Sequence, residues 1–304
     1  MKKLALSLAV LSAILLPTLY AEPAHARTYT WVSHSGSDMN TCQLADPCLT
    51  FNGALNLAEA GAEVSCLDSG TFGNFTVTMS VTIDCSGTVA IPLFDAIYAT
   101  AIVINAPSAV VVLRGLTVKC ALAPNCLNPG IVIEAAAEVH IEDCVIENFA
   151  LQGILDRRTT GGTKLTIKNT IIRNNGSAGI VAAAAPKNSV VLENVHSVGN
   201  TFGIAVATGN GVVINRSVMS ENGVAGIEAD PGATVFVDNS VISHNVSYGV
   251  YALGTVGLAN SDISLNSSSI SGTTMSYGNN RLFLNGPGTA PTPVGATSTD
   301  FGQQ

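Results

Sequence analysis

The sequence predicts an all-β protein, a right-handed parallel β-helix (solenoid) of about nine to ten coils, on three observations. First, a phrase of the form N-x(5–6)-N-x(3)-G-[IV] recurs with a period of 21 to 27 residues, which is typical of coils stacked on one another. Second, apolar residues alternate at the same positions of each copy. Third, charged residues make up only 11% of the chain, against roughly 25% in ordinary globular domains. The clearest copies are NTIIRNNGSAGI from Asn169, NVHSVGNTFGI from Asn194, NRSVMSENGVAGI from Asn215 and NSVISHNVSYGV from Asn239.

Each copy is predicted to hold three short strands. The residues two and four positions before the reference asparagine are apolar in nearly every copy, and this alternation indicates a strand with one buried face. A shorter strand follows the asparagine, and another follows each glycine. Parallel crossovers are right-handed in nearly all cases, which predicts the hand of the helix. The expected inward positions of the first strand are Leu113, Ile141, Ile167, Leu192, Val213, Val237 and Leu258, with Val111, Val139, Leu165, Val190, Gly211, Val235 and Val256.

The repeated asparagines are interpreted as structural corners and not as a ligand site. Asparagine tolerates left-handed backbone at a corner, and its amide can hydrogen-bond to the coils above and below. Two columns are expected: Asn148, Asn175, Asn200, Asn222, Asn245 and Asn266 form one, and Asn169, Asn194, Asn215, Asn239 and Asn260 form the other.

The two ends of the chain differ from the repeats. Residues 1–26 are predicted to be a Sec-type signal peptide with cleavage near Ala26, because two lysines precede an apolar run and a small-x-small site. We therefore expect a secreted or periplasmic protein, and no later apolar run is long enough for membrane insertion. Residues 27–63 are predicted to cap the stack with a helix over about 49–60 that Gly61 ends. The β-helix is expected over 64–285, followed by a loosely held Pro/Thr-rich tail over 286–304.

Seven cysteines in an exported chain favour disulfides. Cys42 and Cys48 flank one short loop, and Cys120 and Cys126 flank another. Cys66 and Cys85 fall in the same column of adjacent coils, where strands lie roughly 4.8 Å apart, within reach of a disulfide. The sequence therefore predicts the pairs Cys42–Cys48, Cys66–Cys85 and Cys120–Cys126. Cys144 is left over and is expected to be a buried free thiol.

Basic residues are concentrated in one coil of an otherwise acidic chain of formal net charge −8. An acidic chain has no general attraction for nucleic acid. The same coil has the longest corner, LDRRTTGGTK, and a basic band on an acidic rod is a plausible clamp for carboxylate or sulfate groups on a polysaccharide. Ion pairs between coils and a solvated loop are the alternative interpretations. The ligand-binding candidates are Glu134, Arg157, Arg158, Lys164, Lys168 and Arg173.

No metal-ligand spacing is found in the sequence. His140, His196 and His244 fall in different columns, so stacking does not bring them together. No metal site and no cofactor are therefore predicted, with calcium left open.

Three segments carry a family resemblance: TYTWVSHSGSD from Thr28, CLTFNGAL from Cys48 and VSCLDSGTFGNFTVTMSVTIDC from Val64. With the coils between them, the chain resembles secreted bacterial right-handed parallel β-helix proteins of the pectin-lyase-like superfamily, over roughly residues 27–293. The resemblance implies cleavage or binding of acidic polysaccharides, or the role of an adhesin or tailspike. The polygalacturonase strings N-T-D, D-D, G-H-G and R-I-K do not occur. The nearest approach to a pectate-lyase site is the group Glu134, Asp156, Arg157 and Arg158.

Since fold does not imply function, these departures favour a non-catalytic protein that binds an acidic polysaccharide or cell-surface polymer near residues 134–173. A polysaccharide lyase or hydrolase is the first alternative, with Asp156, Arg157, Arg158 and Lys168 as catalytic candidates. There Arg157 or Arg158 would abstract a proton and Lys168 would stabilise the developing charge. A passive adhesin or scaffold is the second alternative. The sequence leaves the oligomeric state open.

Overall fold

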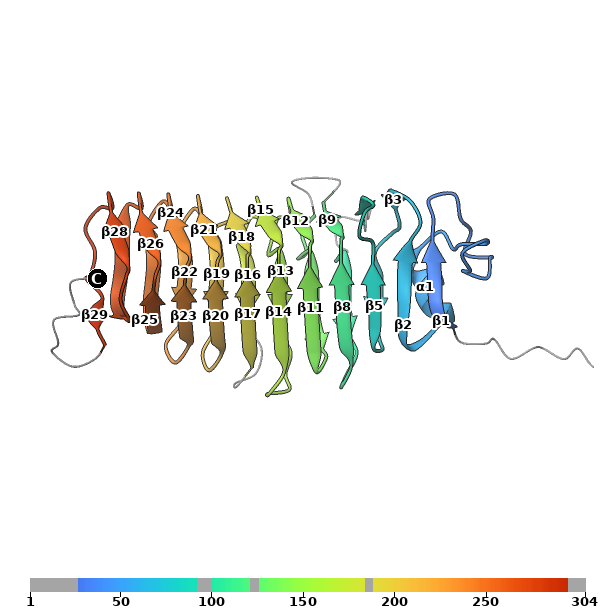
Figure 1. Cartoon of the computed structure of the whole chain (residues 1–304), viewed down its shortest axis with the longest axis horizontal. Coiled ribbons are helices and arrows are strands. Elements are labelled where there is room, and N and C mark those ends of the chain that lie inside the picture. The colour runs from blue at the N-terminus through green and yellow to red at the C-terminus, as the bar shows by residue number, and fades with distance from the viewer. Residues whose placement is uncertain (1–26, 92–99, 121–125, 184–187, 295–304) are drawn as a thin grey trace, which may run out of the picture.

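The chain forms a rod, a right-handed parallel β-solenoid of about nine turns, which confirms the predicted fold class (Figure 1). The computed structural model describes residues 27–91, 100–120, 126–183 and 188–294. The predicted signal peptide and the last ten residues, 295–304, lie outside this part of the chain. Among the described residues, no helix is long and apolar enough to cross a membrane.

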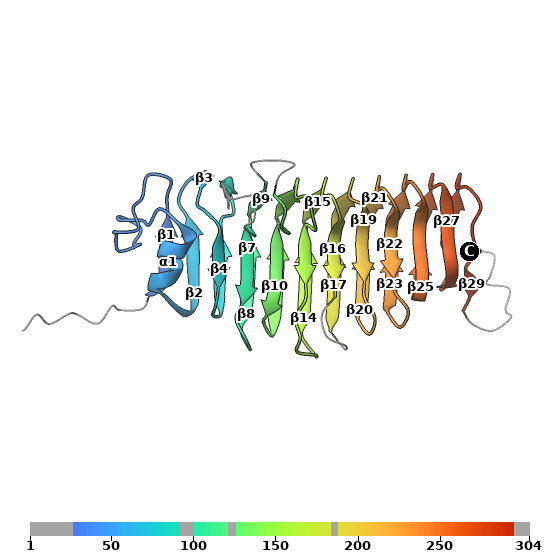
Figure 2. The same cartoon turned by 180° about the vertical axis from the view of Figure 1, so that it is seen from behind.

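Three strand positions per turn build the walls of the rod, and strands of successive turns pair in parallel. The first sheet faces the viewer in Figure 1, and the second does so in Figure 2, which is turned by 180°. The first sheet contains β1 (Arg27–Val32), β2 (Ala58–Cys66), β5 (Val81–Asp84), β8 (Val110–Arg114), β11 (Glu138–Glu142), β14 (Lys164–Lys168), β17 (Ser189–Glu193), β20 (Gly211–Asn215) and β23 (Thr234–Asp238). The second contains β4 (Phe75–Val77), β7 (Ile102–Asn105), β10 (Ile131–Ala135), β13 (Ile154–Asp156), β16 (Ala178–Ala182), β19 (Phe202–Val206) and β22 (Ala225–Ala229).

The remaining strands join or complete these walls. Two long strands, β25 (Tyr248–Ala259) and β27 (Ser268–Ser276), run through both sheets, and β29 (Thr292–Pro293) pairs with the end of β27. The third sheet contains β9 (Thr117–Lys119), β12 (Val145–Glu147), β15 (Ile171–Arg173), β18 (His196–Val198), β21 (Val218–Ser220), β24 (Val241–Ser243), β26 (Asp262–Ser264) and β28 (Arg281–Phe283). A separate pair is formed by β3 (Gly70–Thr71) and β6 (Ala90–Ile91).

Alternate residues of each strand point into the rod and fill it with apolar side chains. Leu113, Ile141, Ile167 and Leu192 are fully buried, as the column pattern predicts. The helix α1 (Phe51–Leu57) lies at the N-terminal end of the rod (Figure 2). It begins at Thr50, whose hydroxyl accepts a hydrogen bond from the Gly53 amide. Phe51 is fully buried and packs on Phe72 and Phe75.

The helix is shorter than the 49–60 expected from the sequence. Residues 58–60 already belong to β2, which pairs with β1 and β5. Gly61, expected to end the helix, lies inside β2 with φ +89°, at an irregularity in the register between β1 and β2. Ala58 already pairs with Arg27 of β1, so strand pairing replaces the last helical turn that the apolar pattern predicts.

The structure contains the disulfides Cys42–Cys48, Cys66–Cys85 and Cys120–Cys126. Cys144 is a buried free thiol, and burial raises its pKa to about 12. Its amide donates a hydrogen bond to the hydroxyl of Thr170 on the next coil. In later coils the hydroxyls of Ser217, Ser240 and Ser261 each accept a hydrogen bond from the backbone N–H at the same position of the preceding coil. Cys144 thus occupies one step of a hydroxyl column and is unreactive, because the thiolate is the nucleophilic form.

A ladder of buried asparagines lines one corner. Each but the last donates its backbone N–H to the side-chain oxygen of the next, as from Asn200 to Asn222 at 3.1 Å. Most also donate a side-chain N–H to the same oxygen, as from Asn222 to Asn245 at 2.9 Å. The ladder comprises Asn175, Asn200, Asn222, Asn245, Asn266 and Asn285. The prediction that Asn148 begins this column is wrong by one residue. Asn148 takes left-handed backbone (φ 68°), and Phe149 occupies the ladder position and donates its amide to Asn175.

The other asparagine column is left-handed as predicted at Asn169, Asn194, Asn239 and Asn260, with φ between 47° and 53°. Asn215 is the exception, because Arg216 takes the left-handed position of that coil (φ 48°). Val212 and Ile214 are therefore the buried residues of β20. Gly211 and Val213 point outward, and Val213 is 42% exposed. A shift of one residue exchanges the two faces of a strand, so the predicted inward positions of this coil are wrong.

The described part of the C-terminal segment follows the last coil closely. Gly286 donates its amide to the Asn266 carbonyl at 3.0 Å, Thr289 to Ile270 at 2.8 Å and Val294 to Ser276 at 2.8 Å. Residues 286–294 are thus held by backbone hydrogen bonds, in contrast to the loose extension expected from their Pro/Thr-rich composition.

Candidate functional site

The longest corner of the basic coil, between β13 and β14, borders a surface pocket of about 420 Å³. Its walls come from the corners of three successive coils. Small side chains and hydroxyl groups dominate the lining, which consists of Pro107, Ser108, Ala135, Ala136, Ala137, Thr159, Thr160, Gly161, Gly162 and Thr163. The added length of the corner therefore creates a concave, hydroxyl-bearing surface on an otherwise regular rod.

A buried ion pair holds this corner in place. Asp156 occupies an inward column whose equivalents on the following coils are Ala182, Val206 and Ala229. Its carboxylate accepts two hydrogen bonds from the Arg158 guanidinium, at 2.9 and 2.6 Å. The Asp156 side chain is 0% exposed and that of Arg158 is 1% exposed.

Arg158 also ties the corner to its neighbours. It donates to the carbonyls of Ala136 and Lys164, at 3.3 and 3.1 Å. The guanidinium therefore bridges the residues before and after the corner insertion. Because both charged groups are enclosed and hydrogen-bonded, these two catalytic candidates have no access to a ligand on the surface.

Two exposed ion pairs are formed by residues that are next to the pocket lining in the sequence. Arg157 bonds to Glu134 on the side of β10 and β13, at 2.5 Å. Lys164 bonds to Glu138 on the side of β11 and β14, at 2.7 Å. The Lys164 ammonium lowers the pKa of the Glu138 carboxyl. In the sequence, the pocket residues 135–137 lie between the two glutamates and 159–163 lie between the two cations, so each ion pair is adjacent in the chain to the pocket lining.

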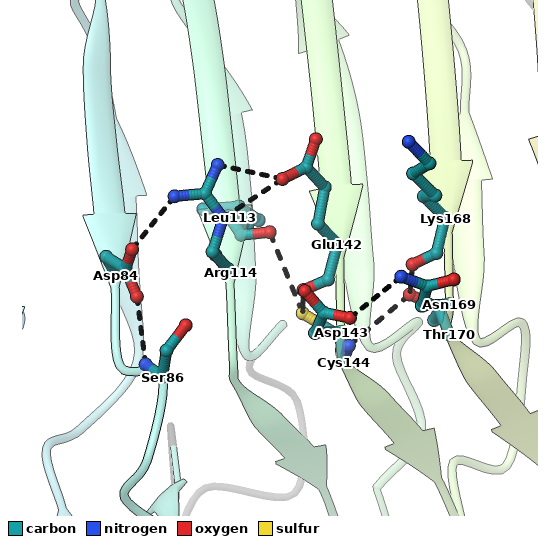
Figure 3. A network of polar contacts seen from close by, with 10 residues as sticks. All are labelled: Asp84, Ser86, Leu113, Arg114, Glu142, Asp143, Cys144, Lys168, Asn169 and Thr170. Carbon is teal, nitrogen blue, oxygen red and sulfur yellow. Dashed lines mark hydrogen bonds and ion pairs between the residues drawn. The ribbon is translucent and has the colours of Figure 1, made fainter.

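A charge ladder crosses the outer face of the first sheet at the C-terminal ends of its strands, the ends away from this corner (Figure 3). Arg114 donates to Asp84 at 2.9 Å and to Glu142 at 2.8 Å. Partial burial by itself would raise the pKa of Asp84, but hydrogen bonds from Ser86 and Arg114 outweigh it and leave that pKa lowered. This pair was not predicted from the sequence, although Asp84 and Arg114 fall in the column of Glu142.

Lys168 is the next rung, directly opposite Glu142 and Glu193 in the strand register. Its side chain is exposed and, among the described residues, forms neither an ion pair nor a side-chain hydrogen bond (Figure 3). Glu193 is instead engaged by Arg216 and by Asn215. Lys168 is therefore available to an anion in solution.

The structure brings some of the predicted ligand-binding residues together and separates others. Arg157 and Lys164 are adjacent in the chain to the residues that line the pocket, with Glu134 paired to Arg157, whereas Lys168 lies at the other end of β14. Arg158 is enclosed beneath the pocket. Arg173 lies on the third sheet, beyond the corner that ends β14, and bonds to Glu147 at 2.7 Å.

The threonine and serine hydroxyls of the pocket were not predicted. The Thr-Thr-Gly-Gly-Thr run in the long corner was the signal that could have indicated them. Within the described residues, no group of three or more His, Cys, Asp or Glu side chains could hold a metal ion.

The coils, the corner and its pocket define a right-handed parallel β-helix protein. The chain belongs to the family described as the right handed beta helix region, whose model matches residues 100–275. No curated protein matches the sequence.

Solved structures similar to this chain include pectate lyase Pel9A, with a TM-score of 0.70 and 16% sequence identity over 90% of this chain and 80% of that one. Alginate lyase from Paenibacillus sp. str. FPU-7 gives a TM-score of 0.55 at 13% identity, over 88% and 99% of the two chains. Tailspike protein 2 from Escherichia coli O157:H7 bacteriophage CAB120 gives 0.56 at 12% identity, over 80% and 38%. At these identities the similarity establishes the fold.

Proposed function

We propose that this is an exported, non-catalytic β-helix protein that binds an acidic polysaccharide at the corner pocket between β13 and β14. The observation that carries the proposal is the pocket itself, a cavity of about 420 Å³ whose lining residues are adjacent in the chain to the exposed cations Arg157 and Lys164. Lys168 adds an exposed cation on the same strand as Lys164. Three disulfides support export, because disulfides persist in oxidising compartments.

The chemistry of the pocket suits a uronate ring. Alanine methyl groups at 135–137 offer an apolar floor to the C–H face of a sugar, and the hydroxyls of Ser108, Thr159 and Thr160 offer hydrogen bonds to its hydroxyl groups. The cations Arg157 and Lys164, next to the lining residues in the chain, can meet the carboxylates of neighbouring rings. Because the chain as a whole is acidic, its net charge repels a polyanion, and only the cations of this coil attract it. The affinity is therefore expected to fall steeply with salt.

Several observations favour binding over catalysis. Asp156 and Arg158 are committed to each other inside the rod, and Arg157 is engaged in an ion pair with Glu134. The pectate lyase and the alginate lyase that share the fold are named for polysaccharide substrates, which supports a polysaccharide as the ligand for either function. A polysaccharide lyase remains the alternative function, because Lys168 is exposed on the same strand as Lys164.

Affinity electrophoresis in gels containing polygalacturonate or alginate tests the proposal. The wild-type protein should be retarded at low salt, and Arg157→Gln/Lys164→Gln should lose most of that retardation. The matched control is Lys119→Gln/Arg173→Gln, which removes the same charge from the third sheet and should migrate like the wild type. Equal behaviour of the two double variants would contradict a local site. Release of unsaturated uronate by the wild-type protein would instead establish the lyase.

A further inference from the structure

A second concave site lies at the C-terminal end of the third sheet. A cavity of about 260 Å³ is lined by Asp262 and Ser264 of β26 and by Arg281 and Phe283 of β28. In the strand register Asp262 is opposite Arg281, and Ser264 is opposite Phe283. Two adjacent strands thus present four side chains of different chemistry on one outward face, away from the corner pocket.

The polar half of this site is fixed in orientation. The Arg281 guanidinium holds the Asp262 carboxylate through two of its nitrogens, Nε to Oδ1 and Nη2 to Oδ2, the latter at 2.5 Å. This fork-to-fork pairing keeps both planar groups in place. An arginine has five N–H donors, and the pair uses two, so three donors remain for a ligand. The carboxylate keeps free lone pairs as acceptors.

The apolar half is an exposed aromatic ring. Phe283 is 63% exposed, although a phenyl ring in water carries a large cost in unburied apolar surface. No aromatic contact is recorded for this ring within the described part of the chain, whereas Tyr277 of the same end packs on Phe236. The ring stands next to the hydroxyl of Ser264, so apolar and hydrogen-bonding surfaces meet inside one small cavity.

We propose that these four residues form a binding site for a neutral sugar ring, separate from the acidic-glycan site. A pyranoside has an apolar C–H face, which would stack on Phe283, and hydroxyl groups at its edge. Those hydroxyls would donate to Asp262 and accept from Arg281. The four side chains carry no net charge, and the Asp262 carboxylate would repel a uronate, which favours a neutral ligand. The cavity is below the roughly 300–1,000 Å³ of pockets for drug-sized ligands, so it admits a single ring.

Affinity electrophoresis in gels containing xylan, galactan or a mixed-linkage β-glucan tests this site. The wild-type protein should be retarded in at least one of the three gels, and the retardation should persist at about 1 M salt, where the Debye length is about 3 Å. Phe283→Ala should weaken binding by about three- to tenfold through the loss of ring stacking. Leu284→Ala is the matched control, because it removes a neighbouring side chain that is 64% exposed and does not line the cavity.

Two results would overturn the inference. One is migration of the wild-type protein in all three neutral gels as in an empty gel. The other is equal retardation of Phe283→Ala and Leu284→Ala. Circular dichroism of both variants confirms that the last coil stays folded. The corner site is tested in acidic gels by different residues and at low salt, so either site can fail without affecting the test of the other.

Discussion

Replacing Arg158 by alanine should destabilise the protein far more than the same change at the adjacent Arg157. The Asp156 carboxylate is 0% exposed and loses two hydrogen bonds in Arg158→Ala, and two carbonyl groups lose their donor. Leaving a buried charge without its partner costs about 3–5 kcal/mol. Arg157 is 56% exposed in its pair with Glu134, and exposed pairs contribute about 0–1 kcal/mol.

Urea denaturation followed by far-UV circular dichroism measures both changes, with the slope m checked for constancy. The double variant Asp156→Val/Arg158→Met should recover at least about 2 kcal/mol of the loss, because replacement of a whole buried pair by apolar residues is often neutral or better. If Arg158→Ala costs less than about 1 kcal/mol, the pair is not the anchor of the corner. Asp156 and Arg158 would then not form a structural pair.

Two further predictions concern other buried or half-buried polar groups. Asn222→Ala should lower the free energy of unfolding by about 1–3 kcal/mol in the same assay, because the buried backbone amide of Asn200 loses its acceptor. The control is the exposed corner variant Asn239→Ala. An equal loss of stability in the two variants would contradict a stabilising role of the ladder. Glu228 has a raised pKa, chiefly because burial disfavours its charged form and also because Asp230 is near. The folded state therefore binds the proton more tightly, and stability falls as pH rises through that pKa. Glu228→Gln should raise the melting temperature at neutral pH and leave it unchanged well below pH 4.5, and a gain that persists in acid would refute this cause.

The fold could be predicted because a weak local pattern repeats many times. The errors occur where a single coil departs from the pattern. In β20 the residues Val212, Val213 and Ile214 are consecutive and apolar, so alternation does not fix which ones point inward. Asn215 then matched the repeat, although Arg216 takes the corner. Register in such a coil is set by packing against its neighbours, which a one-dimensional pattern does not contain.

The site was predictable only as a region. The long corner and the cluster of cations were visible in the sequence, but their roles depend on which side chain turns inward. Asp156 replaces the alanine or valine of a core column, and Arg158 follows it into the rod while Arg157 remains outside. The sequence presents the two arginines as equivalent neighbours. Their difference arises from strand alternation combined with a register that only the stacked coils define.

The distribution of covalent links along the rod gives it a direction of unfolding. The three disulfides all lie between Cys42 and Cys126, and α1 closes the same end. In a solenoid each coil is stabilised mainly by its neighbours, so unfolding propagates from the least supported end. Among the described residues, the coils from β15 onward contain no disulfide. In the last coil, Leu282 of β28 is 39% exposed. Local unfolding and proteolysis should therefore start at the C-terminal coils. A sugar bound beside Phe283 would reversibly stabilise that end of the rod.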